Sequence, residues 1–218
     1  VYKSSNKGVS WGTVRYLGTA IYADSRCTDI AVAPSNGSIV YALGIENRGP
    51  RIYRSSDGGS NWSDVTGNLR DFHSGTSHYG YAVHVAANAP DVVIVGTSLG
   101  AFISTNGGSS WSATMLSQPV KAFAADPRQE MLFAATLYQG VYVTIDGGYS
   151  WEKMNNGLSS LNCIDIECDP MNRLLFVGTS GGGVFRVSTE MIPTPTMTPQ
   201  NTPTPQTSGV AGGWRDYD

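Results

Sequence analysis

The residues best suited to binding chemistry lie in one long polar and aromatic connection between residues 66 and 80. Arginine and carboxylate groups bind hydroxyls, and tyrosine rings stack on sugar faces, so such a loop suits a glycan. The alternative is a solvated loop whose polar residues have no ligand. Together with neighbouring loops, this connection supplies the candidate ligand-binding residues Tyr22, Asp24, Glu46, Arg48, Arg70, Asp71, His73, His78, Tyr79 and Tyr138.

Catalysis by these residues would require a pair of carboxylates that flank a cleft, as in glycoside hydrolysis. Glu46 and Asp71 form the pair that the sequence offers, and we assign them a catalytic role only if the protein is a glycosidase. The sequence contains no nucleophile elbow, phosphate-binding loop, dinucleotide fingerprint or zinc motif. His73 and His78 have the spacing of two metal ligands but lack an identifiable third, so we expect no metal and no cofactor.

The three cysteines, Cys27, Cys163 and Cys168, are too few and too scattered for a disulfide framework. We expect them to be small buried hydrophobic residues. Cys163 and Cys168 fall five residues apart on one predicted strand and should therefore point to opposite faces.

A repeated eight-residue motif organises the chain. Its template is Ser/Thr, any residue, Asp/Asn, any residue, Gly, any residue, Ser/Asn and Trp, and we call each copy a tryptophan box. Asp or Asn binds nearby backbone N–H groups, while glycine supplies a positive φ, so the box is a turn whose Trp covers it. A carboxylate held by its own turn is a poor acid or base, so we assign the boxes a structural role. The boxes span residues 4–11, 55–62, 104–111 and 144–151, with Asn6 and Trp11, Asp57 and Trp62, Asn106 and Trp111, and Asp146 and Trp151 at the key positions.

Strand patterns surround each box. The same order of strands recurs along the chain: a strand that ends at a proline, then an apolar strand, then a strand directly before the box. A short strand follows the box. Four antiparallel strands in about 40 to 50 residues make a propeller blade. We predict strands at 27–33, 39–43, 51–55, 83–88, 92–96, 101–104, 120–125, 131–135, 141–144, 163–168, 174–178 and 184–187, and no helix longer than about two turns.

On these boxes the chain resembles the Asp-box (BNR) repeat β-propellers over about residues 1 to 188. Sialidases, xyloglucanases, sortilin-type receptors and photosystem assembly factors share this blade, so the resemblance implies an all-β propeller and leaves the activity open. The sialidase pattern of three arginines and a Tyr–Glu pair is not matched. Two departures are Asn6 with Lys7 in the first box and Ser188-Thr189-Glu190, without a box, in the last unit.

The repeat divides the chain into a propeller over 1–190 with incomplete first and last blades, a Pro/Thr-rich linker over 191–208, and a tail or start of another module over 209–218. About four blades are present, either as a closed ring or as part of a larger one. The linker is extended and semi-rigid by composition and is typical of secreted and cell-surface proteins. The expected location is therefore extracellular or at the cell surface.

Composition narrows the function classes. The net charge of −3 argues against a nucleic-acid binder, and no apolar run is long enough to span a membrane as a helix. The leading hypothesis is a non-catalytic propeller that binds a protein or a glycan or serves in assembly. The first alternative is part of a xyloglucanase-like glycoside hydrolase, and the second is a structural subunit of a surface layer or filament that assembles with itself.

Overall fold

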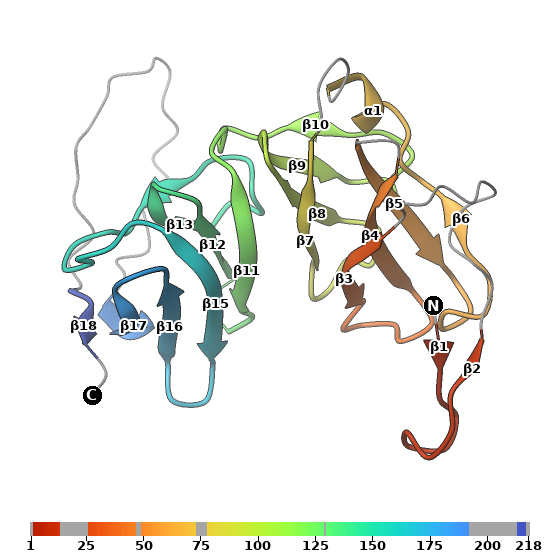
Figure 1. Cartoon of the computed structure of the whole chain (residues 1–218), viewed down its shortest axis with the longest axis horizontal. Coiled ribbons are helices and arrows are strands. Elements are labelled where there is room, and N and C mark those ends of the chain that lie inside the picture. The colour runs from red at the N-terminus through yellow and green to blue at the C-terminus, as the bar shows by residue number, and fades with distance from the viewer. Residues whose placement is uncertain are drawn as a thin grey trace. The chain divides into compact units, whose positions relative to one another are not determined.

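The computed structural model describes residues 2–13, 26–46, 49–72, 78–128, 130–191 and 213–216. It is an all-β protein, which confirms the predicted fold class (Figure 1). A two-stranded sheet of β1 (Tyr2–Lys3) and β2 (Gly12–Thr13) comes first, and four antiparallel four-stranded sheets follow. Strands that pair in chain order within such sheets are the blades of a β-propeller.

The four complete blades have equivalent strands. The second blade contains β3 (Arg26–Val32), β4 (Val40–Glu46), β5 (Gly49–Ser55) and β6 (Ser63–Asp64). The third contains β7 (Gly80–Val85), β8 (Val93–Thr97), β9 (Gly100–Ser104) and β10 (Ser112–Ala113). The fourth contains β11 (Val120–Asp126), β12 (Met131–Thr136), β13 (Gly140–Thr144) and β14 (Glu152–Lys153). The last contains β15 (Cys163–Asp169), β16 (Leu174–Thr179), β17 (Gly183–Ser188) and β18 (Arg215–Asp216).

All twelve predicted strands are present, and one is displaced. The strand predicted at 83–88 is β7, which begins three residues earlier at Gly80. The prediction aligned the third blade with the second by matching Pro90 to Pro34. In the second blade the turn closes with the Ala33 N–H donating to the Ile39 carbonyl, and the equivalent bond in the third blade runs from the Ala86 N–H to the Val92 carbonyl. Pro90 therefore lies later in its turn than Pro34 does.

Helical segments are short, as predicted. Within the ranges that the structure describes, the helices are α1 (Leu69–Phe72) and the 3₁₀ turn η1 (Thr189–Met191). No helix in those ranges is long and apolar enough to cross a membrane.

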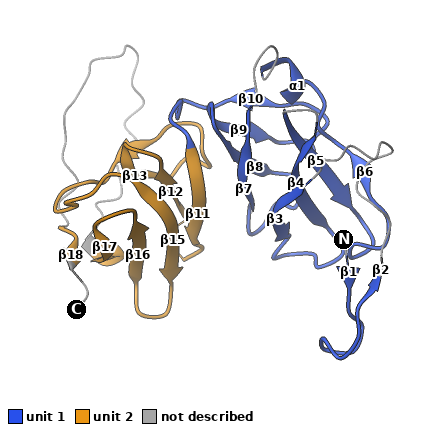
Figure 2. Cartoon of the chain, in the orientation of Figure 1, with its two compact units in different colours: residues 1–119 blue, residues 120–218 orange. Residues whose placement is uncertain are grey.

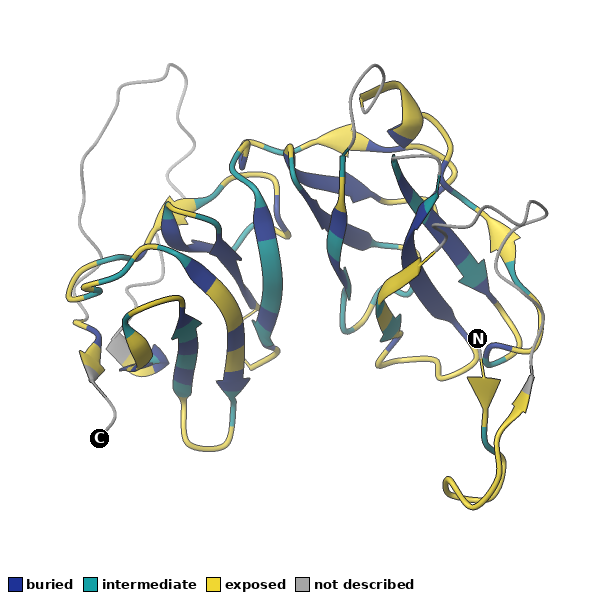
Figure 3. Cartoon of the chain, in the orientation of Figure 1, coloured by how far each residue is buried: buried dark blue, intermediate teal, exposed yellow. Residues whose placement is uncertain are grey.

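The chain divides into two compact units, residues 1–119 and 120–218 (Figure 2). In the first unit, the second and third blades pack face to face around Tyr41, Leu43 and Val95. In the second unit, the fourth and last blades pack in the same way around Phe133, Val177 and Phe185. The middle strands β8 and β12 are buried along their whole lengths (Figure 3).

A β-bulge interrupts the first strand of every complete blade at the same place. In β15 it lies between Cys163 and Asp165, and in β3 between Cys27 and Asp29. Because a bulge reverses the alternation of side chains, Cys163 and Cys168 both enter the core of the second unit, and the prediction of opposite faces is wrong. The prediction that all three cysteines are buried is also wrong, since Cys27 is exposed.

The tryptophan boxes are hydrogen-bonded turns. In the second box, Asp57 Oδ1 accepts the backbone N–H of Asn61 at 2.8 Å, and Ser55 Oγ accepts that of Gly59 at 2.8 Å. The third box repeats both bonds through its Asn106 and Ser104 side chains. The boxes at residues 4–11 and 144–151 repeat them too. A neutral asparagine therefore forms this turn as well as an aspartate does.

The first box tolerates Lys7 at a strained position. Lys7 has φ 58°, where the other boxes have a glycine at φ 66–77°. A left-handed backbone costs a side-chain-bearing residue roughly 1–2 kcal/mol. The next box position is glycine in every copy.

The box tryptophans are not equivalent. The indole N–H groups of Trp62 and Trp151 donate to carbonyls of their own turns, at Gly59 and Gly148, and both side chains are half-buried. Trp111 is 3% exposed and donates instead to the Val65 carbonyl of the neighbouring blade at 3.0 Å. The prediction that the Trp of each box covers its own turn is therefore corrected for Trp111, whose indole binds the neighbouring blade.

The fifth tryptophan completes the last blade. Trp214 is 4% exposed, and its indole donates to the Met154 carbonyl of the fourth blade at 2.7 Å. Val65 directly follows β6, the fourth strand of the second blade, and Met154 directly follows β14, the fourth strand of the fourth blade. Trp214 therefore has the same position in the last blade that Trp111 has in the third blade. The strand β18 follows directly and pairs with β17. The last blade was expected to be incomplete; the structure corrects this, because the blade has four strands.

Replacing Trp111 by alanine should lower the free energy of unfolding by about 3–5 kcal/mol, because it removes a buried ring and an inter-blade hydrogen bond. Urea denaturation of the purified variant measures this loss. The matched control is Trp11→Ala, since Trp11 is 64% exposed and should lose less than about 0.5 kcal/mol. Equal losses in the two variants would contradict the inter-blade role.

Replacing Asp57 by asparagine should change stability little at pH 7 but should remove an acid-sensitive contribution. Hydrogen bonds from the Asn61 backbone, the Asn61 amide and the Ser55 hydroxyl lower the Asp57 pKa from 3.8 to about 2. A carboxylate with a lowered pKa stabilises the fold above its unfolded pKa, and this contribution is lost as the pH falls from about 4 to about 2. Thermal unfolding across that pH range should show a smaller loss of stability in Asp57→Asn than in the native chain. Asn106→Asp should show a larger loss.

Candidate ligand-binding surface

The two ends of each blade carry different turns. The boxes and the turns between first and second strands lie at one end, because the strands are antiparallel and follow in chain order. The opposite, box-free end carries the starts of the first strands and the turns between second and third strands. Loops on a rigid scaffold commonly carry binding residues, so the box-free end is the candidate surface.

A pair of tyrosines lies at this end of the third blade. The rings of Tyr79 and Tyr81 stack with centroids 6.2 Å apart and an interplanar angle of 23°. Tyr79 is 41% exposed. Burial, with the neighbouring Tyr79 second, raises the pKa of Tyr81 above its usual value. Tyr81 occupies the bulge of β7, which lies between Gly80 and Ala82. Bulges re-aim side chains, and this one places an aromatic ring at the rim of the blade.

The turn between β8 and β9 fixes the position of this pair. Ser98 N–H donates to the Tyr79 carbonyl at 2.9 Å, and Tyr79 N–H donates to Ser98 Oγ at 3.1 Å. His78 Nδ1 lies 3.3 Å from the same hydroxyl. Leu99 at the tip of the turn is 37% exposed. The result is a small platform of aromatic, apolar and polar groups on a rigid turn, which we call the tyrosine platform (His78, Tyr79, Tyr81, Ser98 and Leu99).

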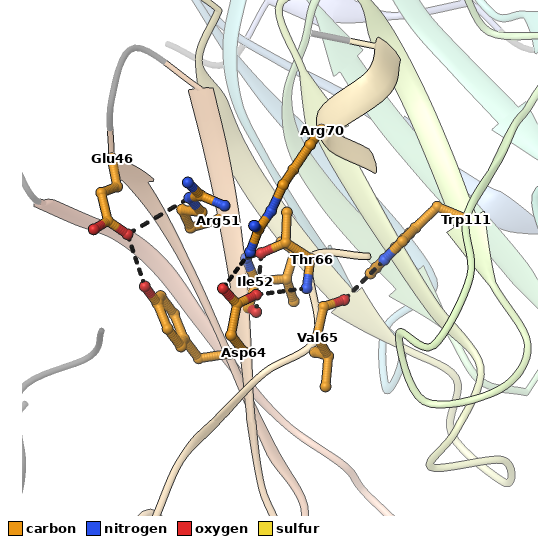
Figure 4. A network of polar contacts seen from close by, with 9 residues as sticks. Glu46, Arg51, Ile52, Asp64, Val65, Thr66, Arg70 and Trp111 are labelled. Atoms are coloured by element: carbon orange, nitrogen blue, oxygen red, sulfur yellow. Dashed lines mark hydrogen bonds and ion pairs between the residues drawn. The ribbon is translucent and has the colours of Figure 1, made fainter. Parts of the chain in front are cut away.

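A polar network lies at the same end of the second blade (Figure 4). Glu46 Oε2 accepts the Tyr53 hydroxyl at 3.0 Å and lies 3.5 Å from Arg51 Nε. Burial, and then the hydrogen bond to Glu46, raise the pKa of Tyr53 well above its usual range. Arg51 Nη1 is buried and has no hydrogen-bond partner among the described residues. Glu46 is therefore held by two groups of its own blade.

A second carboxylate of this network is Asp64, at the end of β6. Arg70 on α1 pairs with it, and Thr66 N–H donates to it at 2.9 Å. Burial opposes ionisation of Asp64, but the Thr66 hydrogen bonds and the charge of Arg70 outweigh it and lower the pKa. Leu69 anchors α1 in the core, and the Phe72 ring lies 4.9 Å from Phe102. The helix is thus tied to the second and third blades.

The structure brings together only some of the predicted site residues. It joins His78 with Tyr79, while Glu46 and Arg70 each bind a partner that the sequence analysis did not single out. Asp71 is exposed on α1, and the contacts of Glu46 above involve neither Asp71 nor its helix. Tyr138 belongs to the second unit, where it is 65% exposed with φ 70°. Tyr22, Asp24, Arg48 and His73 lie outside the described residues.

Sequence reasoning missed the partners of these residues. Tyr53 and Asp64 are neighbours on adjacent strands. Tyr81 lies at the position of the bulge that all four complete blades share. A bulge repeated at one position could have been found by aligning the blades on their first strands instead of on proline. Among the residues that the structure describes, no group of three His, Cys, Asp or Glu side chains could hold a metal ion.

Comparison with known proteins identifies the fold. No protein-family model and no curated protein matches the chain. Among solved structures, an ancestral GH74 enzyme superposes with a TM-score of 0.60 and 25% identity, over 75% of this chain and 22% of that one. The GH74 enzyme of Niastella koreensis gives 0.58 and 18%, over 75% and 29% of the two chains. YCF48 bound to D1 peptide gives 0.58 and 17%, over 82% and 53%.

These neighbours are β-propellers with four-stranded antiparallel sheets, in agreement with the blades described above. The chain spans about a fifth to a half of their length. The neighbours include both glycoside hydrolases and a protein that binds a peptide, so the shared fold accommodates more than one kind of function.

His84, which lies on β7 below the tyrosine platform, should make the protein acid-sensitive. Burial lowers its pKa from 6.5 to about 4. Because the unfolded chain binds this proton more readily, stability should fall by up to about 3 kcal/mol as the pH drops from about 6.5 to about 4. In the His84→Gln variant, the urea-denaturation midpoint should change less with pH over this range. His78→Gln is the control, and an equal flattening in it would contradict the assignment.

Proposed function

We propose that the chain is a non-catalytic Asp-box β-propeller module whose box-free end binds a glycan or a protein. The box geometry supports the Asp-box assignment, because each of the four boxes uses an Asp or Asn side chain to bind the backbone of its own turn. The observation that carries the binding function is the tyrosine platform of the third blade.

The tyrosine platform suits a sugar ligand in particular. The flat faces of sugar rings are apolar and stack on aromatic rings, while their hydroxyls bind polar groups beside the ring. Tyr79 offers an exposed ring, and His78 and Ser98 lie within hydrogen-bond distance of each other beside it. A protein ligand would use the same aromatic surface together with Leu99, since aromatic residues dominate protein interfaces.

The environment of the predicted carboxylates favours binding over hydrolysis. Glu46 accepts the Tyr53 hydroxyl and pairs with Arg51, so it serves the internal structure of its blade. Glycoside hydrolysis instead needs two carboxylates that face each other across a substrate. Asp71, the other member of the predicted pair, lies on a separate helical turn.

The second candidate function is part of a xyloglucanase-like glycoside hydrolase. The observation in its favour is the similarity to GH74 enzymes, one of which shares 25% identity over three quarters of this chain. On this hypothesis Glu46 or Asp71 would act together with residues of other blades.

We place the protein outside the cell or at its surface. The support is compositional, because residues 191–208 form a Pro/Thr-rich, uncharged segment of the kind that joins modules of secreted proteins. If no glycan binds, we propose that the ligand of the box-free end is a protein.

The test measures binding of the purified chain to xyloglucan oligosaccharides and to an array of other polysaccharides by calorimetry and affinity electrophoresis. Tyr79→Ala and Tyr81→Ala should each weaken glycan binding by roughly 2- to 10-fold, the value of one aromatic contact. Tyr149→Ala is the matched control, because Tyr149 is 55% exposed but belongs to a box.

The same samples separate the alternatives. Release of reducing sugar from xyloglucan, abolished by Glu46→Gln or Asp71→Asn, would favour the hydrolase. Absence of binding to every glycan would overturn the glycan form of the proposal, and binding that survives both platform variants would overturn the site.

A further inference from the structure

The fourth strand of the last blade is connected differently from those of the second, third and fourth blades. In those three blades, seven residues of a tryptophan box join the third strand to the fourth, at 56–62, 105–111 and 145–151. In the last blade, β17 ends at Ser188 and β18 begins at Arg215, so the 26 residues 189–214 stand in place of the box. No box turn therefore holds β18 beside β17.

A well-defined site nevertheless receives this strand. Trp214 is 4% exposed, and its indole N–H donates to the Met154 carbonyl at 2.7 Å. Its backbone N–H donates to the Asn156 carbonyl at 2.9 Å. Gly157, with φ 90°, leaves room for the Trp214 backbone, since a Cβ there would lie 2.7 Å from the Trp214 carbonyl oxygen. We call Met154, Asn156, Gly157 and the edge of β17 the Trp214 site.

The segment that fills the Trp214 site is short and extended. Its strand β18 consists of Arg215 and Asp216, which lie opposite Arg186 and Phe185 of β17. Two residues of strand pairing add little, so the buried indole of Trp214 is the main anchor of the segment. Strand addition at a sheet edge together with one deeply bound side chain is a mode in which proteins bind separate peptides.

The composition of the connection favours a strand from another chain. Residues 191–208 include five prolines and no charged residue, and such a sequence is by composition a semi-rigid spacer of about 3.1 Å per residue. Neighbouring strands of one sheet lie only about 5 Å apart. A tether supports binding best where its preferred length matches the span between its ends. A long, stiff tether therefore suits a site on another chain better than a site beside its own start.

We propose that the Trp214 site binds residues 213–216 of a second copy of this chain, so that two copies exchange their last strands. The contacts of the strand are the ones described above, whichever copy supplies it. Exchange of an identical element is a low-cost route to a dimer, because every site stays filled. The Trp214 site is separate from the tyrosine platform, so the proposal stands or falls independently of the proposed glycan or protein binding.

Light scattering and sedimentation equilibrium of the 218-residue chain test the proposal with two complementary variants. Trp214→Ala removes the anchor and leaves the site intact, whereas Gly157→Ala obstructs the site and leaves the anchor intact. The native chain should approach the mass of two chains as its concentration rises, and each variant alone should keep the mass of one. An equal mixture of the variants should restore two-chain particles, because the intact site of one variant takes the intact segment of the other.

Gly147→Ala is the matched control for Gly157→Ala. Gly147 has a similar φ of 77°, but open space surrounds the position of its Cβ. This variant should keep the native mass, which separates obstruction of the site from strain at a left-handed glycine. Thermal unfolding establishes that each variant is folded.

A synthetic peptide of residues 209–218 provides a second measurement. It should bind the Trp214→Ala chain at least about tenfold more tightly than the Trp214→Ala form of the same peptide does, because a buried tryptophan anchor dominates such an interface. Fluorescence anisotropy of a labelled peptide measures this difference.

Three outcomes would overturn the proposal. The first is a native mass of one chain at every concentration. The second is a mixture of the two variants that keeps the mass of one chain, because the strand would then bind only within its own chain. The third is equal binding of the two peptides, which would show that the indole does not anchor the segment.

Discussion

The structure depends on one constraint: a sheet with two apolar faces must cover both of them. The second, third and fourth blades each have a middle strand that is mostly or fully buried, so such a blade alone would expose a large apolar surface. The pairs of blades in each unit cover one face of each sheet by packing face to face, with Tyr41 and Phe133 at the centres of the packed faces. Bulges, boxes and inter-blade tryptophans all serve that packing.

The boxes and tryptophans have divided tasks. A box holds its own turn through an Asp or Asn side chain that binds backbone N–H groups, whether or not that side chain carries a charge. The indole then either stays with its turn, as in Trp62, or reaches the neighbouring blade, as in Trp111. Trp214 performs the second task without a preceding box of the template, which shows that the indole contact, and not the box, joins the blades.

A rigid arrangement of this kind leaves the loops at the box-free end available for function. The box-free end presents the tyrosine platform, whose position is set by the bulge of β7 and by the hydroxyl of Ser98. The exposed Tyr79 ring and the polar groups beside it suit a ligand.

The sequence by itself determined the all-β fold, the twelve main strands and the box turns, because these depend on local alternation, glycine and short side-chain-to-backbone bonds. Tertiary structure decided the rest. Bulges reversed the face of Cys163, pairing with β17 turned residues 215–216 into a strand, and cross-strand register joined Glu46 to Tyr53. Such outcomes depend on contacts between residues distant in the chain, and a single sequence does not encode their register locally.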